Sequence, residues 1–151
     1  MLSISRESPC QDDIIRLIRQ SDALMQSLYP AESNHLVDID SLAQPHVHFL
    51  VARDQKRALG CGAFVVGQDR QAEMKRVFVD PDARGKGVAR AIMEALERAA
   101  EAEGVALMQL ETGIKQPEAI ALYRKLGYIE RGPFGSYQPD PLSLFMEKRL
   151  A

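Results

Sequence analysis

The most informative segment of the sequence is Arg84-Gly85-Lys86-Gly87-Val88-Ala89. It lies between a strand-like run, residues 73–79, and a strongly helical run, residues 88–103. The two glycines have no Cβ, so the backbone can turn sharply there and approach a ligand closely. A helix that begins at this point presents unpaired N–H groups and the positive end of its dipole. The stretch therefore predicts an anion site, and a phosphate or pyrophosphate suits it best.

Composition and charge narrow the kind of partner that this site serves. The chain has 151 residues, which suits one domain over residues 1–151, and its formal net charge is −2. This small charge gives no reason to expect nucleic acid or an anionic membrane as a partner. The local positive charge near the glycines suits a small polyanion, and it comes from Lys75, Arg76, Arg84, Lys86 and Arg90.

Cysteine usage and the lack of long apolar runs favour a cytoplasmic protein. Cys10 and Cys61 lie far apart and form no paired framework, which is typical of a reduced compartment. The first residues show no basic segment followed by an apolar one, so no secretory signal is expected. No apolar run approaches the ~20 residues that a membrane span needs.

The first half of the chain predicts a strand, a helix and a three-stranded meander. Residues 2–6 alternate apolar and polar side chains, as a strand does. Ser8 can cap a helix with Pro9 in its first turn, and that helix should end near Pro30. A short second helix is expected over residues 38–42. Short polar turns separate three antiparallel strands, expected over residues 47–53, 58–66 and 71–79.

The second half alternates helices and strands. The helix of residues 88–103 should stop at Gly104, which suits the left-handed position after a helix. The elements expected after it are a strand over 105–111, a helix over 116–126, and strands over 128–131 and 143–148. This order favours right-handed crossovers onto one sheet. The fold class is therefore α/β, with a mixed sheet that is antiparallel first and partly parallel later.

The segment of residues 132–141 is long for a connection between two strands. It carries two aromatic residues and three prolines, so we expect it to be stiff. Two interpretations stay open: a surface loop packed by its own rings, or a wall of the substrate pocket.

Two further segments carry a resemblance to a known family. Arg84-x-x-Gly87-x-Ala89 matches the Q/R-x-x-G-x-G/A signature of the Gcn5-related N-acetyltransferase (GNAT) superfamily. Residues 121–128, a predicted helix that ends in Gly127-Tyr128, match the second common segment of that family. The order of elements also resembles the GNAT fold from end to end. The residues from Leu110 to Lys148 resemble those of a bacterial subgroup of GNAT acetyltransferases.

The resemblance implies the GNAT fold, a mixed and mostly antiparallel central sheet flanked by about four helices. It also implies acetyl-CoA as acyl donor, an amine of a small molecule or peptide as acceptor, and direct attack in a ternary complex. Many members form homodimers, and the sequence leaves this open. The alternative is a GNAT-fold sensor or interaction module that binds acetyl-CoA without transferring its acetyl group.

The same resemblance assigns residues to CoA. It implies that the pyrophosphate binds the backbone of Arg84, Gly85, Lys86, Gly87, Val88 and Ala89, and that the pantetheine arm pairs with Val77, Phe78 and Val79. The side chains of Lys86 and Arg90 either reach CoA phosphates or stay solvated. Gln116 stands where many relatives carry an asparagine that contacts the pantetheine arm.

Acetyl transfer needs a deprotonated amine, a donor for the oxyanion and a proton for the departing thiolate. Glu73, eleven positions before Arg84, is the candidate general base, and this spacing resembles that of the histone acetyltransferases of the superfamily. The alternative is a solvated glutamate paired with Lys75 or Arg70. Tyr123 is the candidate general acid, since the resemblance points its hydroxyl at the CoA sulfur. Its alternative is a core aromatic.

Candidate acceptor contacts come from segments that border the acceptor pocket in GNAT proteins. They are Glu32, Ser33 and His35 after the first helix, Glu111 and Thr112 at a strand end, and Tyr137 in the long loop. His46 and His48 alternate on one strand, but no further ligand of suitable spacing is apparent, so no metal is expected. The glycine stretch fits neither a Rossmann fingerprint, because position 90 is arginine, nor a Walker A loop.

Overall fold

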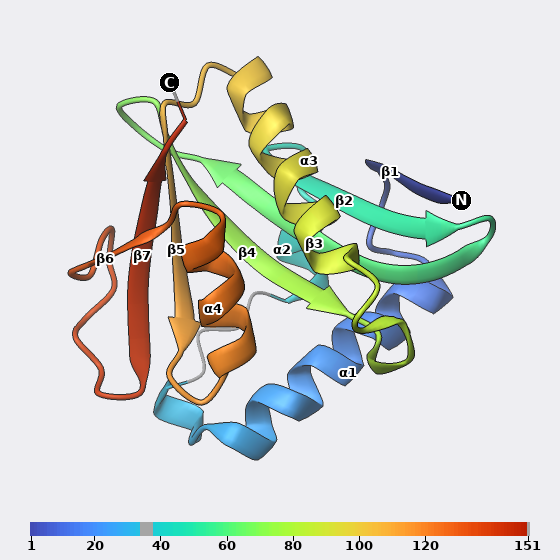
Figure 1. Ribbon diagram of the computed structural model, residues 1–151, viewed down its shortest axis with the longest axis horizontal. Helices are drawn as coiled ribbons and strands as arrows, with labels where there is room; N and C mark the ends of the chain where they lie inside the picture. Colours follow the sequence, from blue (N-terminus) through green and yellow to red (C-terminus); the bar gives the residue numbers. More distant parts are fainter. Residues whose placement is uncertain (34–37, 151) are drawn as a thin grey trace.

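The computed structural model describes residues 1–33 and 38–150 as one sheet with helices on both faces (Figure 1). The strands are β1 (Leu2–Arg6), β2 (Val47–Asp54), β3 (Arg57–Val66), β4 (Gln71–Val79), β5 (Leu107–Gly113), β6 (Ile129–Arg131) and β7 (Ser143–Arg149). The helices are α1 (Asp12–Leu28), α2 (Ile39–Leu42), α3 (Val88–Ala102) and α4 (Pro117–Lys125), and the short 3-10 turns are η1 (Ala31–Ser33) and η2 (Pro81–Ala83). The strand order is β1-β2-β3-β4-β5-β7-β6.

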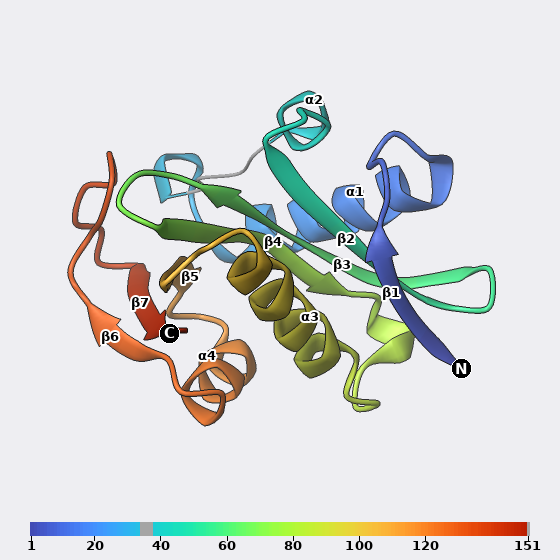
Figure 2. The ribbon, with the colours of Figure 1, turned by 90° about the horizontal axis from the view of Figure 1, so that it is seen from above.

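Two apolar cores fill the space between the sheet and its helices. Figure 2 shows α1 and α2 on one side of the sheet and α3 and α4 on the other. Ile14, Leu17 and Ile18 of α1 pack against Phe49, Cys61 and other buried residues of β2 and β3. On the opposite face, α3 and Tyr123 of α4 pack on the sheet in the larger core. The α/β fold class with a mixed sheet, which the sequence predicts, is confirmed, and its helices cover both faces of the sheet.

The sheet divides where β4 meets β5. Every neighbouring pair of strands is antiparallel except β4 and β5, which run parallel. Their pairing covers Gln71↔Leu107 through Met74↔Leu110 and stops there, although both strands continue. In the described part of the chain, the β5-facing backbone edge of Val77–Val79 therefore has no strand beside it. The two strands part at this point and leave room between them.

A bulge at Arg76 changes which way the side chains of β4 point. Arg76 has a φ of 58°, a conformation that non-glycine residues seldom adopt, and the β3–β4 register shifts between Cys61 and Ala63. Before the bulge, Ala72 and Met74 face the α3 core, whereas after it the odd-numbered Val77 and Val79 pack there. Phe78 joins the opposite core with α1.

Two glycines in β3 let α3 lie close to the sheet. A Cβ on Gly60 would come within 2.9 Å of the Ile92 side chain and 2.8 Å of the Phe78 carbonyl oxygen. One on Gly62 would come within 2.9 Å of both Ile92 and Leu96. Glycine is therefore required here by the close approach of the helix that carries the anion site at its start.

One predicted boundary is wrong, and another differs by two residues for a clear reason. The first helix begins at Asp12 and not at Ser8, because the Ser8 hydroxyl accepts a hydrogen bond from the Cys10 N–H at 3.0 Å in a local turn. β5 begins at Leu107 and not at residue 105, because the Val105 N–H bonds the Ala100 carbonyl at 3.0 Å and closes the end of α3 around Gly104. The other boundaries agree with the prediction to within a residue or two.

Candidate active site

The glycine loop is open and shaped for an anion. Gly85 and Gly87 have φ angles of 78° and 75°, and a Cβ built on either would meet no atom within 4 Å. Gly87 is the N-cap of α3 and has no side chain with which to bond the helix start. The first N–H groups of α3 therefore point outward at the positive end of its dipole. These features fit the pyrophosphate of CoA.

A cleft lies where β4 and β5 part. It is lined by residues of α1, β4, β5, α4 and the loop before β7. The sequence-predicted members of the lining are Ser33, Glu73, Val77, Phe78, Glu111, Thr112, Gln116, Tyr123 and Tyr137. The parted strands thus bring the donor and acceptor candidates into one cavity, although these residues are distant in the chain.

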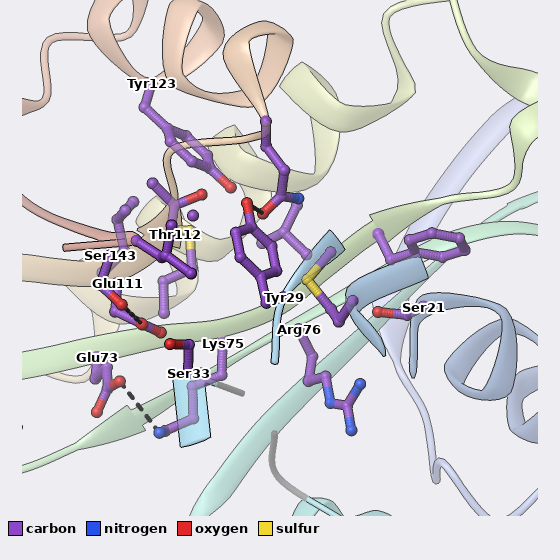
Figure 3. A pocket seen from close by; sticks show the side chains of 18 of the residues that line it. Ser21, Tyr29, Ser33, Glu73, Lys75, Arg76, Glu111, Thr112, Tyr123 and Ser143 are labelled. Atoms are coloured by element: carbon purple, nitrogen blue, oxygen red, sulfur yellow. Dashed lines mark hydrogen bonds and ion pairs between the residues drawn. The ribbon is translucent and has the colours of Figure 1, made fainter. Parts of the chain in front are cut away.

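Tyr123 points into the cleft from α4 (Figure 3). It is 9% exposed, its ring meets the edge of Tyr128 at 6.1 Å, and burial raises its pKa to about 12. A hydrogen bond with Thr112 opposes this rise in pKa. The hydroxyl therefore keeps its proton and is a hydrogen-bond donor, and its acidity is weaker than the ordinary phenol value that the sequence suggests. Tyr123 belongs to both the core and the cleft, so its two interpretations are compatible.

Glu73 lies on β4 in a three-way contact. Its Oε2 accepts a hydrogen bond from the Tyr137 hydroxyl at 2.5 Å and lies 3.1 Å from Lys75 Nζ. Lys75 Nζ also donates to the Tyr137 oxygen at 3.4 Å. Burial and the nearby carboxylates of Glu73 and Glu111 raise the pKa of Tyr137, so it remains a donor. The predicted pairing of Glu73 with Lys75 is present, and it places both groups at the cleft wall.

The long loop before β7 is packed by aromatic rings and also forms a wall of the cleft, so both interpretations of residues 132–141 apply. Phe134, Tyr137 and Phe145 contact each other with ring centroids 5.2 to 5.8 Å apart, so the loop is packed by its own rings. Tyr137 also lines the cleft. The Ser33 hydroxyl donates to Asp140 Oδ2 at 2.8 Å, which ties η1 to this loop. The acceptor side of the cleft is therefore bounded by two connected segments.

Tyr29, at the end of α1, closes the cleft from another side. Its hydroxyl accepts from the Lys115 N–H at 3.0 Å and donates to Gln116 Oε1 at 3.4 Å. A Cβ on Gly113 would lie 1.9 Å from that hydroxyl, so only glycine fits beneath it. Gln116, the predicted pantetheine contact, thus has its amide oxygen engaged by Tyr29. No sequence pattern marks Tyr29, because its partners lie more than eighty residues away.

The remaining predicted residues differ in their placement. The Glu111 carboxylate accepts from the Ser143 hydroxyl at 2.7 Å, and both residues line the cleft with Thr112 (Figure 3). Glu32 is exposed and lies outside the lining, next to Ser33. His35 lies outside the described residues. Val79, Arg84, Lys86 and Arg90 lie toward the open α3 end, beyond the cleft lining.

Several residues of the cleft were not predicted from the sequence. Arg76 is 6% exposed at its side chain and pairs with Asp22 of α1. Ser21 and Met25, also from α1, complete that wall. The apolar periodicity of α1 assigns these two positions to a packing face, and only the closeness of α1 to the parted strands makes them cleft residues.

The described residues were also considered as metal ligands and as membrane spans, and they provide neither. Among residues 1–33 and 38–150, no group of three or more histidine, cysteine, aspartate or glutamate residues is placed to hold a metal ion. Within the same residues, none of the helices combines the length and apolarity needed to cross a bilayer.

Comparison with known proteins identifies the family. The model of the acetyltransferase (GNAT) family matches residues 14–128. An IAA acetyltransferase from Azospirillum brasilense is 51% identical over 150 residues, which are 99% of this chain and 98% of that protein. The uncharacterised N-acetyltransferase YsnE of Bacillus subtilis is 30% identical over 139 residues, 91% of this chain and 92% of its own. The chain belongs to the GNAT family.

A solved structure supports the same conclusion. A candidate acyl-CoA N-acyltransferase from Klebsiella pneumoniae has a TM-score of 0.85 at 39% identity, covering 100% of this chain and 99% of that one. The resemblance and the predicted GNAT fold are confirmed. The chain is an N-acetyltransferase that uses acetyl-CoA as its acyl donor.

Proposed function

We propose that this enzyme transfers the acetyl group of acetyl-CoA directly to an amine of a small molecule or peptide in a ternary complex. The observation that carries this proposal is that Glu73 and Tyr123 line the same cleft, which lies beside the gap between β4 and β5. One residue can accept a proton from the amine, and the other can donate to the departing sulfur.

The donor half of the site extends from the glycine loop to the parted strands. The backbone from Arg84 to Ala89 holds the pyrophosphate, and the free edge of Val77–Val79 pairs with the pantetheine arm as an added strand would. Lys86 and Arg90 are placed near the same helix start and add positive charge. Gln116 reaches the arm through its amide nitrogen, since its oxygen is bonded to Tyr29.

The reaction needs one proton removed and one supplied. When bound, acetyl-CoA supplies an acetyl thioester whose carbonyl carbon is open to attack. Glu73 takes the proton of the attacking amine, directly or through a water, and Tyr137 and Lys75 hold its carboxylate in place. Tyr123 stabilises the departing thiolate by hydrogen bonding. The space for the acceptor is lined by Ser33, Glu111, Thr112 and Tyr137, and Glu32 lies at its rim.

The experiment that tests this proposal measures thiol release from acetyl-CoA across a panel of acceptors. The panel contains amino acids, a polyamine, an aminoglycoside, a peptide with a free N-terminus, and IAA, since a relative is named for it. Acetylated product should be found for at least one amine. If CoA binds but none of the acceptors is acetylated, the protein is better described as a sensor. If IAA is acetylated and none of the amines is, the proposal of an amine acceptor is wrong.

A further inference from the structure

The pair of Glu73 and Lys75 presents opposite charges side by side. Both residues point to the same face of β4, because they are two apart on a strand. Their charged atoms lie 3.1 Å apart, and the side chains are 22% and 23% exposed. Figure 3 shows both at one wall of the cleft, apart from Tyr123 and Thr112. An occupant of the acceptor half therefore meets a carboxylate and an ammonium together.

Lys75 is the cationic side chain that a molecule bound in the acceptor half of the cleft would contact. Among the described residues that line the cleft, Lys75 is the only lysine. Its neighbour Arg76 is paired with Asp22 and is more deeply buried, with a side chain 6% exposed. The Tyr137 hydroxyl is hydrogen-bonded to both Glu73 and Lys75 and holds them in position. The pair is thus held in position while part of each group stays accessible.

We infer that the acceptor is a free α-amino acid, with its amine at Glu73 and its carboxylate at Lys75. An α-amino acid carries an ammonium and a carboxylate on one carbon, so it complements two adjacent opposite charges. An acceptor with an amine alone would bring its positive charge next to Lys75 with no carboxylate of its own to pair with that ammonium, and a polycation would be disfavoured further. This inference rests on the proposed function and narrows its acceptor.

Lys75 acts in this scheme as a specificity residue whose own bonds do not change. The amine nitrogen loses a proton to Glu73 and forms a bond to the acetyl carbon, while the bond from that carbon to sulfur breaks. The thiolate takes the second proton that the nitrogen releases as the amide forms, directly or through a water, while the Tyr123 hydroxyl donates a hydrogen bond to the sulfur. The carboxylate of the acceptor remains ionised at Lys75 throughout.

The test compares three acceptors that share one side chain: L-leucine, L-leucinamide and 3-methylbutylamine. We expect the wild-type kcat/KM to be higher for leucine by about tenfold or more, the effect of one charge-assisted hydrogen bond. The amide has the less basic amine and would otherwise react more readily. Lys75→Met keeps the length of the stem and removes the charge, so the preference should vanish. Lys75→Arg should retain most of it, and Lys56→Met, in an exposed turn, should leave it unchanged.

The possible outcomes separate this inference from the function on which it rests. Equal or better acetylation of the two amines without a carboxylate overturns the inference and leaves the proposed function intact. A preference for leucine that survives in Lys75→Met also overturns it, because the carboxylate would then be read elsewhere. Failure to acetylate any amine in the wider panel overturns both.

Discussion

Burial decides what the Tyr123 hydroxyl can contribute. Because its pKa is raised to about 12, the hydroxyl is protonated at every pH where the enzyme would work. It can therefore stabilise a thiolate that forms nearby, and it should add no ionisation of its own to the pH profile in that range.

Replacing Tyr123 by phenylalanine removes the hydroxyl and keeps the ring packed against Tyr128. We expect kcat to fall by about 10²-fold, the usual effect of removing one hydrogen-bond donor from a charge that develops in the transition state. The KM for acetyl-CoA should change little, and steady-state kinetics with the best acceptor would measure both. Unchanged turnover would remove Tyr123 from the mechanism.

Glu73→Gln keeps the shape of the side chain but not its basicity. At neutral pH, kcat should fall by about 10²-fold, because alkyl amines with a pKa of about 10 are then mostly protonated. The loss should shrink as the pH rises, since solvent then deprotonates the amine. A pH–rate profile of the variant provides the check, and a deficit of constant size at all pH values would argue for a role in binding.

At the scale of elements, the start of α3 and the end of α1 carry the site. The α3 start is open, with glycines at positive φ and space around them. The α1 end is closed, with the Tyr29 hydroxyl packed onto Gly113 and bonded to the loop before α4. The start of α3 leaves room for the donor, and the end of α1 fixes one wall of the cleft.

Gly87→Glu should abolish CoA binding by placing a charged side chain at the anion site. The fold should survive, because a Cβ there meets no atom within 4 Å and the left-handed backbone costs only ~1 kcal/mol. Calorimetric titration with CoA would measure the loss. Gly87→Asn is the matched control, since asparagine tolerates this conformation without adding charge. Retained affinity in Gly87→Glu would refute the placement of the pyrophosphate.

Gly113→Ala should push Tyr29 out of its position. A Cβ would lie 1.9 Å from the Tyr29 hydroxyl, so we expect a loss of ~1–3 kcal/mol in unfolding free energy and a lower kcat. Denaturant melts and kinetics would show both effects. The double variant Gly113→Ala with Tyr29→Ala should be less destabilised than the sum of the two single changes. Strict additivity would mean that the two residues do not interact.

The sequence predicts those features of the fold and the site that depend on interactions between residues close together in the chain. The strands, helices and glycine loop are encoded locally by periodicity and turn residues, and these predictions agree with the structure closely. The cleft depends on contacts across long separations, such as Tyr137 with Glu73 and Tyr29 with Gly113. No local pattern reports such contacts, and the bulge at Arg76 has no glycine to mark it.

At the scale of the whole molecule, the sheet consists of two parts joined by few backbone pairs. β1–β4 and β5–β7 are each paired along most of their lengths, but β4 and β5 share only the register from Gln71↔Leu107 to Met74↔Leu110. A ligand bound along Val77–Val79 would lie in the gap and contact both parts. Donor binding should therefore stabilise the whole fold.

CoA at about a hundred times its Kd should add ~2.7 kcal/mol to the free energy of unfolding. For a chain of this size, that corresponds to a rise in Tm of ~5–10 °C. Thermal melts with and without CoA would measure the shift, and Gly87→Glu should show none. A rise of similar size in that variant would indicate that CoA binds elsewhere.

The bulge at Arg76 has a further consequence for how β4 can change. One additional residue allows Glu73 and Lys75 to face the acceptor while Val77 and Val79 remain in the core behind the free backbone edge. Deleting Arg76, the residue between Lys75 and Val77, would exchange the inward and outward positions on one side of the deletion. Substitutions in β4 can therefore alter acceptor choice gradually, whereas a change in its length would disrupt catalysis and the core at the same time.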